Sequence, residues 1–373
     1  MPTADGKFGV GIVGTGWCAA AHLRAFAGNP YTRVVLMCGR NEQRARRKLK
    51  DFGAEVADVS FTRKYDDLLS AEDIDIIAIS TPNHLHAEQA IQAAQAGKHF
   101  VLEKPTGLDV RELAKIGTAV RRAQVRTIVS FVLHYNPFLK FAYWLRESGR
   151  LGAIRYVRCQ YLSRILESYP GWSWLKTAKS GRSHLLAAGC HAVDALRWCS
   201  GLEPTAVSAY HTQFTKGYQW PTSIVVNLQL GRRAIGQVVS STDYMMPYTF
   251  GVELMGDRAT LRDDTIFWKD EPIDLDELRQ ANPFPEVTLK PDRALDGSST
   301  IRIDCEMPAS GNVRSHPFQG EIDELVNCIR QNRESHLNVF DAQKTMEVCL
   351  AADRSATNNG RTVKLPLIKQ TGD

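Results

Sequence analysis

The residues best suited to chemistry begin with a glycine turn near the N-terminus. Gly14-Thr15-Gly16-Trp17-Cys18-Ala19 follows an apolar run and opens a helical pattern. In such a turn the first glycine permits the bend, the second lets the backbone approach a pyrophosphate, and the alanine lets helix and strand pack closely. This context favours dinucleotide binding over an ordinary strand–turn–helix. The expected contacts are Gly14, Thr15, Gly16, Trp17, Cys18 and Ala19.

The end of the second expected strand reads Cys38-Gly39-Arg40-Asn41. Enzymes that use NAD usually carry an acidic residue here for the ribose 2′-hydroxyl. This sequence has a guanidinium instead, which can pair with a 2′-phosphate or stack on the adenine. We therefore expect Gly39 and Arg40 to contact the cofactor, and NADP is favoured over NAD. Arg44 is more simply explained by a solvated helix face.

Two further strands end in residues that would reach the same crevice, because strand ends line it in doubly wound sheets. Ser80-Thr81-Pro82-Asn83 follows one strand and Glu103-Lys104-Pro105 the next. Lys104 could orient a substrate hydroxyl and share its proton during hydride loss, whereas a lysine after a strand is most often a surface charge. A helix cap is the alternative role for Asn83. The expected cofactor contacts here are Thr81, Pro82, Asn83, His86, Glu103 and Lys104.

A fourth group of residues opens a helix in the middle of the chain, in Gly189-Cys190-His191-Ala192-Val193-Asp194. His191 and Asp194 are three apart and share a helix face. Imidazole suits proton transfer near neutral pH, so we expect catalytic roles for both, with a satisfied core histidine as an equal alternative. His84 and His86 are two apart, but the spacing supplies no third ligand, and we predict no metal site.

The elements that must position these residues change in character near residue 133. Before it, apolar strands alternate with helices, which predicts a doubly wound parallel sheet, an α/β Rossmann domain over 1–133. After it, strands dominate, which predicts an α+β domain over 134–373 with a large, open, mostly antiparallel sheet. Asp270–Ser315 is rich in Pro, Asp and Gly and predicts long loops. The expected strands are Phe8–Val13, Val34–Cys38, Ile74–Ser80, His99–Leu102, Val125–Phe131, Ala153–Leu162, Ala206–Gln213, Ser223–Leu230, Ala234–Ser240, Gly251–Met255 and Val287–Leu289. The expected helices are Trp17–Ala27, Glu42–Phe52, His86–Ala96, Val110–Arg122, Phe138–Ser148, Leu185–Trp198, Ile322–Gln331 and Ala342–Asn358.

Bulk properties exclude several classes of protein. The 373 residues suit two domains. The net charge of +5 comes from scattered residues, which argues against a nucleic-acid partner. Eight cysteines without a C-x-x-C pair indicate reduced thiols. Neither a signal peptide nor a membrane span is recognisable, so we expect a cytoplasmic protein with no membrane partner.

Together these residues resemble the Gfo/Idh/MocA family of oxidoreductases over nearly the whole chain. The resemblance rests on Gly-Ile-Val-Gly-Thr-Gly-Trp with His22 following, Ser-Thr-Pro-Asn-His-Leu-His, Leu-Glu-Lys-Pro, Gly-Cys-His-Ala-Val-Asp and the tail from Asp341 to Ser355. It implies hydride exchange between NAD(P) and a secondary hydroxyl or ketone of a sugar, glycoside or cyclic polyol, in a homodimer or homotetramer. It also implies that Lys104 is the catalytic lysine and His191 the acid/base. One departure is Ala187, where many members carry an aspartate.

Substrate contacts would come from aromatic and imidazole side chains, because aromatic faces suit the C–H faces of a sugar ring. Core packing is an equal alternative for each. Two other functions stay open: a glycoside-cleaving enzyme that oxidises and reduces a ring hydroxyl in one cycle, and a non-catalytic dinucleotide sensor. The expected substrate contacts are Tyr135, Trp172, Trp174, Tyr244 and His316.

Overall fold

The chain divides into two units, each built on its own sheet. The computed structural model describes residues 6–55, 58–165, 167–169, 171–268, 270, 272–307 and 316–368. Unit 1 comprises Met1–Val132, Ile165–Arg182 and Ala309–Met346, and unit 2 comprises Leu133–Arg164, Ser183–Pro308 and Glu347–Asp373. The long N-terminal part of unit 1 ends beside the expected boundary. Two later segments also belong to it, and no pattern in the sequence indicates them.

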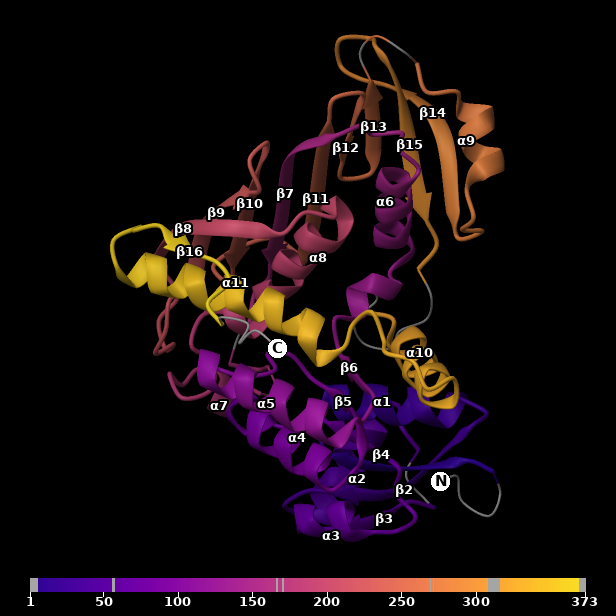
Figure 1. Ribbon diagram of the computed structural model, residues 1–373, viewed down its shortest axis with the longest axis vertical. Coiled ribbons are helices and arrows are strands. Elements are labelled where there is room, and N and C mark those ends of the chain that lie inside the picture. The colour runs from indigo at the N-terminus through magenta and orange to yellow at the C-terminus, as the bar shows by residue number, and fades with distance from the viewer. Residues whose placement is uncertain are drawn as a thin grey trace. The chain divides into compact units, whose positions relative to one another are not determined.

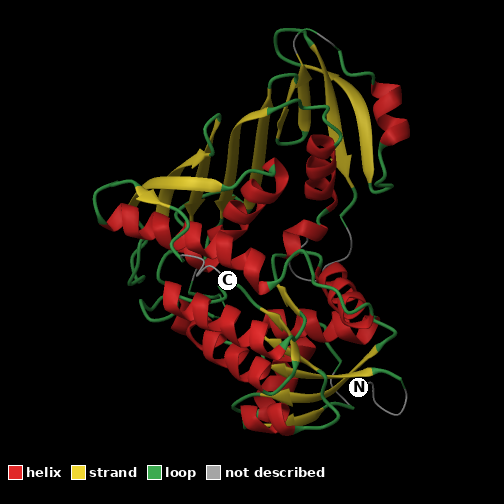
Figure 2. Ribbon diagram, in the orientation of Figure 1, coloured by secondary structure: helices red, strands yellow, loops and turns green. Residues whose placement is uncertain are grey.

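Unit 1 contains a six-stranded parallel sheet in the order β3-β2-β1-β4-β5-β6, which confirms the doubly wound prediction (Figures 1 and 2). The sequence patterns missed its edge strand β3 and the helix after it. The strands are β1 (Phe8–Val13), β2 (Thr32–Cys38), β3 (Ser60–Thr62), β4 (Ile76–Ile79), β5 (His99–Leu102) and β6 (Thr127–Val129). The helices are α1 (Trp17–Gly28), α2 (Glu42–Asp51), α3 (Tyr65–Ser70), α4 (His86–Gln95), α5 (Val110–Ala123), α7 (Trp172–Leu175) and α10 (Phe318–Arg330).

The central strands of this sheet are apolar throughout because helices cover both faces. All four residues of β4 are buried. Helix α1 packs against β1 and against α10, and α4 packs against α5. Gly97 follows α4 with a φ of +71°, a left-handed conformation that favours glycine. The packing brings the ends of β1, β4, β5 and β6 to one edge, beside α1 and α10.

Unit 2 contains a ten-stranded sheet in the order β14-β15-β13-β12-β11-β7-β10-β9-β8-β16. Only the β7–β10 pair is parallel, which confirms the expected open, mostly antiparallel sheet. Its strands are β7 (Ile154–Leu162), β8 (Pro204–Thr212), β9 (Ser223–Leu230), β10 (Ala234–Ser241), β11 (Thr249–Gly256), β12 (Ala259–Arg262), β13 (Thr265–Trp268), β14 (Val287–Arg293), β15 (Ser299–Cys305) and β16 (Val363–Lys364).

Long loops over Asp270–Ser315 are a wrong prediction for much of that segment. It contains the helix α9 (Leu275–Ala281), capped by the Asp274 side chain, and the antiparallel pair β14–β15. The Pro, Asp and Gly residues that suggested loops lie mainly at turns and at exposed strand positions. A strand with so many exposed polar residues lacks the apolar pattern by which a strand is recognised. Residues 308–315 lie outside the described residues.

Helices cover one face of this sheet, and the helix that carries His191 begins irregularly. Helix α8 (Cys190–Ser200) packs on β7, β10 and β11, and α6 (Pro137–Glu147) packs against α8. The expected single helix over Leu185–Trp198 is instead a π-helical turn at Leu185–Gly189 followed by α8. The C-terminal helix α11 (Val339–Thr357) is followed by Gly360, whose φ is +76°. No helix in the described ranges is long and apolar enough to cross a membrane.

Candidate active site

The glycine turn of unit 1 has the geometry that a dinucleotide requires. Gly14 has a φ of +118°, and a Cβ on it would lie 2.2 Å from the Ser80 carbonyl oxygen. Gly16 directly precedes α1, and a Cβ on it would meet no protein atom within 4 Å. The fold therefore demands glycine at 14, whereas at 16 the backbone is left open at the N-terminus of a helix, where a phosphate binds well. These residues fit a nicotinamide dinucleotide.

The groove at the ends of β2 and β3 would receive the adenosine half. A Cβ on Gly39 would lie 2.6 Å from Thr15 Cγ2, so Gly39 lets the two loops meet. Arg40 is exposed, and its carbonyl oxygen accepts a hydrogen bond of 3.1 Å from Arg63 Nε. A groove of about 580 Å³ here is lined by Arg63 and Lys64 among other residues. Sequence reasoning missed these two cations because the short strand β3 was not recognised.

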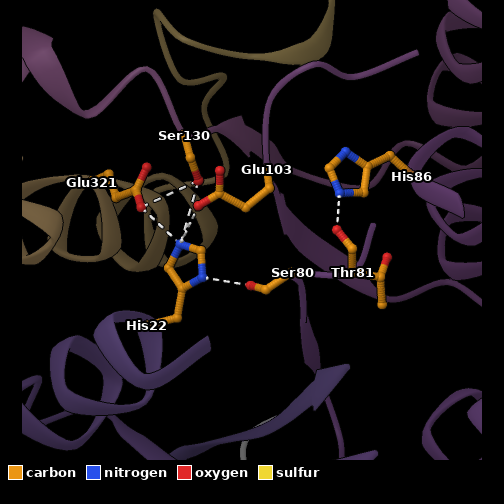
Figure 3. A network of polar contacts seen from close by, with 7 residues as sticks. All are labelled: His22, Ser80, Thr81, His86, Glu103, Ser130 and Glu321. Atoms are coloured by element: carbon orange, nitrogen blue, oxygen red, sulfur yellow. Dashed lines mark hydrogen bonds and ion pairs between the residues drawn. The ribbon is translucent and has the colours of Figure 1, made fainter. Parts of the chain in front are cut away.

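The loop after β4 is fixed by side chains that the sequence singled out. His86 Nδ1 lies 2.7 Å from the Pro105 carbonyl oxygen and Nε2 2.7 Å from the Thr81 carbonyl oxygen (Figure 3 shows the second contact). Burial lowers the pKa of His86. A neutral His86 donates to one carbonyl at a time and joins this loop to the cis Lys104–Pro105 bond.

Two side chains in the same loop contact the segment 165–182 of unit 1. Asn83 Nδ2 donates a hydrogen bond of 3.0 Å to the Ser180 carbonyl oxygen, and His84 contacts the Ser180 hydroxyl. The alternative role for Asn83 as a helix cap is wrong, because Pro82 is the N-cap of the turn Asn83–Leu85 and Leu85 is the N-cap of α4. Within the described residues, no group of three or more His, Cys, Asp or Glu side chains could hold a metal ion.

Lys104 follows β5 in a buried polar environment. Glu103 is 5% exposed. Burial lowers the pKa of His316 to about 3, with the positive charge of Lys104 as the second cause, so His316 is a neutral imidazole near the lysine. Burial raises the pKa of Tyr169 to about 12, and the Tyr169 hydroxyl accepts a hydrogen bond of 2.9 Å from Trp17 Nε1. Sequence reasoning did not find Tyr169, which no motif marks.

A buried network that includes Glu103, the residue before Lys104, joins α1, three strand ends and α10 (Figure 3). His22 Nδ1 lies 2.9 Å from Ser80 Oγ, and His22 Nε2 lies 3.0 Å from Glu321 Oε1. The same Nε2 lies 3.3 Å from Ser130 Oγ and 3.9 Å from Glu103 Oε1. His22 and Glu321 are both fully buried. Two carboxylates therefore face one imidazole inside the fold.

In unit 2, aromatic rings surround His191. The Tyr161 ring stacks on His191 at 5.8 Å between centroids with an interplanar angle of 14°, and it lies 6.0 Å from the His184 ring. Tyr248 meets Tyr161 edge-on at 5.2 Å. His184 is itself held by Ser163 Oγ at 2.9 Å and Ser240 Oγ at 2.7 Å. Beyond its place on an expected strand, no sequence pattern marks Tyr161.

Asp194 is engaged by a different histidine. Its Oδ2 lies 2.7 Å from His134 Nε2, and both side chains are buried. His134 in turn stacks on Trp198 with ring centroids 3.9 Å apart. This contact offers Asp194 a structural role between the helical turn Val132–Tyr135 and α8, and a catalytic role for it stays a prediction. Ala187 lies buried in the π-helical turn before His191.

The expected catalytic and substrate residues are divided between the two units. Lys104 belongs to unit 1 and His191 to unit 2, so their cooperation stays a prediction. Unit 1 also holds His316 and the half-buried Trp172 and Trp174, which lie on α7. Unit 2 holds Tyr135 and Tyr244, and Tyr244 is 39% exposed.

The chain belongs to the Gfo/Idh/MocA family. The family model for the oxidoreductase family with an NAD-binding Rossmann fold matches residues 8–131, and the GFO/IDH/MocA C-terminal domain matches residues 142–262. The chain is therefore a member of an NAD(P)-binding oxidoreductase family, and this confirms the resemblance predicted from its motifs.

Named relatives act on sugars and cyclitols. Levoglucosan dehydrogenase of Pseudarthrobacter phenanthrenivorans is 32% identical over 54% of this chain and 53% of its own length. Inositol 2-dehydrogenase of Rhizobium meliloti is 27% identical over 53% and 57% respectively. The match thus spans about half the length of these curated relatives.

Solved structures share the fold over nearly the whole chain. The structure of levoglucosan dehydrogenase in complex with NADH and levoglucosan has a TM-score of 0.79 at 22% identity and covers 96% of this chain and 100% of its own. The structure of GenD2 from gentamicin A biosynthesis in complex with NAD has a TM-score of 0.76 at 21% identity, with 96% and 97% covered. At these identities the likeness supports the fold.

Proposed function

We propose that this protein is an NAD(P)-dependent dehydrogenase that transfers hydride between the cofactor and a secondary hydroxyl or ketone of a sugar, glycoside or cyclic polyol. The single observation that carries the proposal is Lys104, which directly follows β5 and buried Glu103 and whose positive charge acts on the buried, neutral His316. The named relatives that oxidise levoglucosan and inositol support the substrate class.

The nicotinamide, when bound, supplies the hydride acceptor or donor. The residues of this chain do the rest. Gly14–Ala19 bind the pyrophosphate at the N-terminus of α1, and Thr81, Pro82, Asn83 and His86 shape the crevice wall. Lys104 donates a hydrogen bond to the reacting oxygen and shares its proton as the carbonyl forms. His191 serves as the second acid/base, with Tyr161 stacked on its ring to fix its orientation.

We further propose a preference for NADP. Arg63 and Lys64 line the groove that would hold the 2′-phosphate, together with the carboxylates Glu42 and Asp67. Arg40 is exposed at the end of β2, where the sequence has no carboxylate. Solved relatives hold NAD or NADH, so the proposal concerns this chain's own residues. Measured dissociation constants test it. Arg40→Ala and Arg63→Ala each weaken NADP binding roughly tenfold and leave NAD binding within about twofold. Tighter binding of NAD with no effect of either substitution would refute the preference.

A homodimer or homotetramer in the cytoplasm completes the proposal. The sheet face of unit 2 that the helices leave uncovered carries exposed apolar side chains on neighbouring strands: Tyr210 opposite Val225, and Ile235 beside Tyr156 and Met255. Such a face suits burial against a second copy. All eight cysteines are free thiols, which supports a reducing compartment. Sedimentation analysis measures the assembly directly.

The experiment that tests the enzymatic proposal is a screen for formation of reduced cofactor with sugars, polyols, aldonic acids and glycosides. Lys104→Ala abolishes turnover but keeps cofactor affinity within a few fold. Release of an aglycone without net reduced cofactor would assign the glycoside-cleaving cycle instead. Cofactor binding with no turnover on any substrate would assign the sensor.

A further inference from the structure

The buried network around His22 contains two carboxyl groups, those of Glu103 and Glu321, but only one imidazole among its described residues. Glu103 and Glu321 both face His22, and the described part of the chain offers no hydrogen-bond partner to Glu103 Oε1 or Glu321 Oε2. Burying an uncompensated charge is costly, so two buried carboxylates need cations nearby. The imidazole of His22 contacts both carboxyl groups and, when protonated, supplies a positive charge to each of them.

We propose that His22 is a positioning residue: held between Ser80 and Glu321, its imidazolium faces Glu103 and orients that carboxyl group beside the catalytic lysine segment. The imidazole is fixed from both sides, with Ser80 Oγ on Nδ1 and Glu321 Oε1 on Nε2, so that Nε2 also faces Glu103 (Figure 3). The inference rests on the proposed function, because the role that it gives to His22 requires Lys104 to be the catalytic lysine.

The protonation of His22 depends on Glu321. Burial alone would lower the pKa of His22, but the hydrogen bond and negative charge of Glu321 outweigh it, so the pKa is raised. Burial raises the pKa of Glu321, and the His22 contact opposes this. The pair therefore stabilises the imidazolium form.

Other titratable groups face the same cluster from neighbouring elements. Cys18 lies one turn before His22 on α1; burial first, and then the charge of Glu103, raise the pKa of its thiol, so it stays neutral. His86 on α4 and His316 before α10 stay neutral because burial lowers their pKa values. Tyr169 stays protonated. Among these described groups, the charges near Glu103 at neutral pH are those of His22, Glu321 and Lys104.

The test compares two substitutions that both affect the contact of α10 with α1. His22→Gln keeps a side-chain donor but removes the charge. Asp323→Asn is the matched control, because Asp323 on α10 accepts a hydrogen bond of 2.7 Å from Asn29 at the end of α1, away from Glu103. Turnover is measured from pH 5 to 9 on the full chain with saturating cofactor. In His22→Gln the positive charge that faces Glu103 is lost, and the acid limb of the turnover profile moves upward by at least about one pH unit. In Asp323→Asn it stays in place.

The variant Glu321→Gln provides a second test that keeps His22 in place and does not require turnover. The midpoint of the His22 imidazole titration, followed by NMR, moves to lower pH by at least about one unit in this variant and stays unchanged in Asp323→Asn. Equal pH profiles for His22→Gln and Asp323→Asn, or an unmoved His22 titration in Glu321→Gln, overturn the proposal. Absence of turnover in the unmodified protein refutes the proposed function, while the titration still decides whether Glu321 sets the charge of His22.

Discussion

The two glycines of the dinucleotide turn differ in what their backbone requires, and alanine at each should separate folding from cofactor binding. At Gly14 an alanine would occupy a φ of +118° with its Cβ 2.2 Å from the Ser80 carbonyl oxygen. Backbone strain at such a position costs about 1–3 kcal/mol, and the strand end must shift to relieve the overlap. We expect a total loss of about 3 kcal/mol, which lowers the melting temperature by about 6–12 °C at the sensitivity of a large domain.

At Gly16 the same substitution should leave the fold nearly intact. The backbone φ is −90°, and the added Cβ meets no protein atom within 4 Å. The loss of a glycine at a helix N-cap costs no more than about 1 kcal/mol. The Cβ instead fills the space that the pyrophosphate needs, so affinity for the cofactor falls at least about tenfold.

Differential scanning fluorimetry without cofactor and fluorescence titration with NADH and NADPH measure the two effects on the same preparations. Equal melting temperatures for Gly14→Ala and Gly16→Ala would refute the conclusion that the fold requires glycine at position 14 but not at position 16. Wild-type cofactor affinity in Gly16→Ala would show that the dinucleotide does not lie on this turn.

Three further predictions concern buried or hydrogen-bonded charges. Asp194→Ala removes the buried carboxyl group that contacts His134 and should cost about 1–3 kcal/mol in a urea denaturation, while a near-neutral result would contradict a structural role for this hydrogen bond. The pKa of His22 is raised in the folded chain, so its contribution to stability is complete below about pH 6.5 and is lost as the pH rises through the folded pKa. The difference in melting temperature between the unmodified protein and His22→Gln should therefore narrow from pH 6 to 9. A constant difference would contradict this expectation. For Asp243, burial raises the pKa, but hydrogen bonds from Ser223 and Thr215 outweigh burial and lower the pKa below its usual value. Its contribution to stability is therefore present above about pH 4 and is lost as the pH falls through the folded pKa. Melting curves should show that Asp243→Asn is less stable than the unmodified protein at pH 7 and nearly as stable at pH 3.

Features that depend on residues close together in the sequence were predicted from local sequence patterns. The glycine turn between β1 and α1 is set by neighbouring residues, and the sequence predicts it correctly. The three-residue strand β3 is too short to show a period, and the π-helical turn before His191 depends on packing against Ser240, whose Oγ would lie 2.1 Å from a Cβ on Gly189. No pattern in the sequence signals either of them.

The partners of the predicted site residues are the part that sequence reasoning could not reach. His22 appeared only as a residue of the family motif, and its partner Glu321 lies 299 positions later. Lys104 was recognised by its position after a strand, but its neutral neighbour His316 was expected as a substrate contact. In each case the chemistry of one residue depends on the burial and charge of another that comes from a distant segment.

This dependence explains why unit 1 is discontinuous in sequence. The ends of β4, β5 and β6 bring Ser80, Glu103 and Ser130 to one edge, but they supply only one carboxylate and no imidazole. Helix α1 adds His22, and α10, from the third segment of the unit, adds Glu321. A truncated Rossmann domain ending at Val132 would keep the glycine turn but lose the carboxylate that holds His22 protonated. The charge beside Lys104 is therefore a property of the assembled unit, and the first 132 residues alone do not contain it.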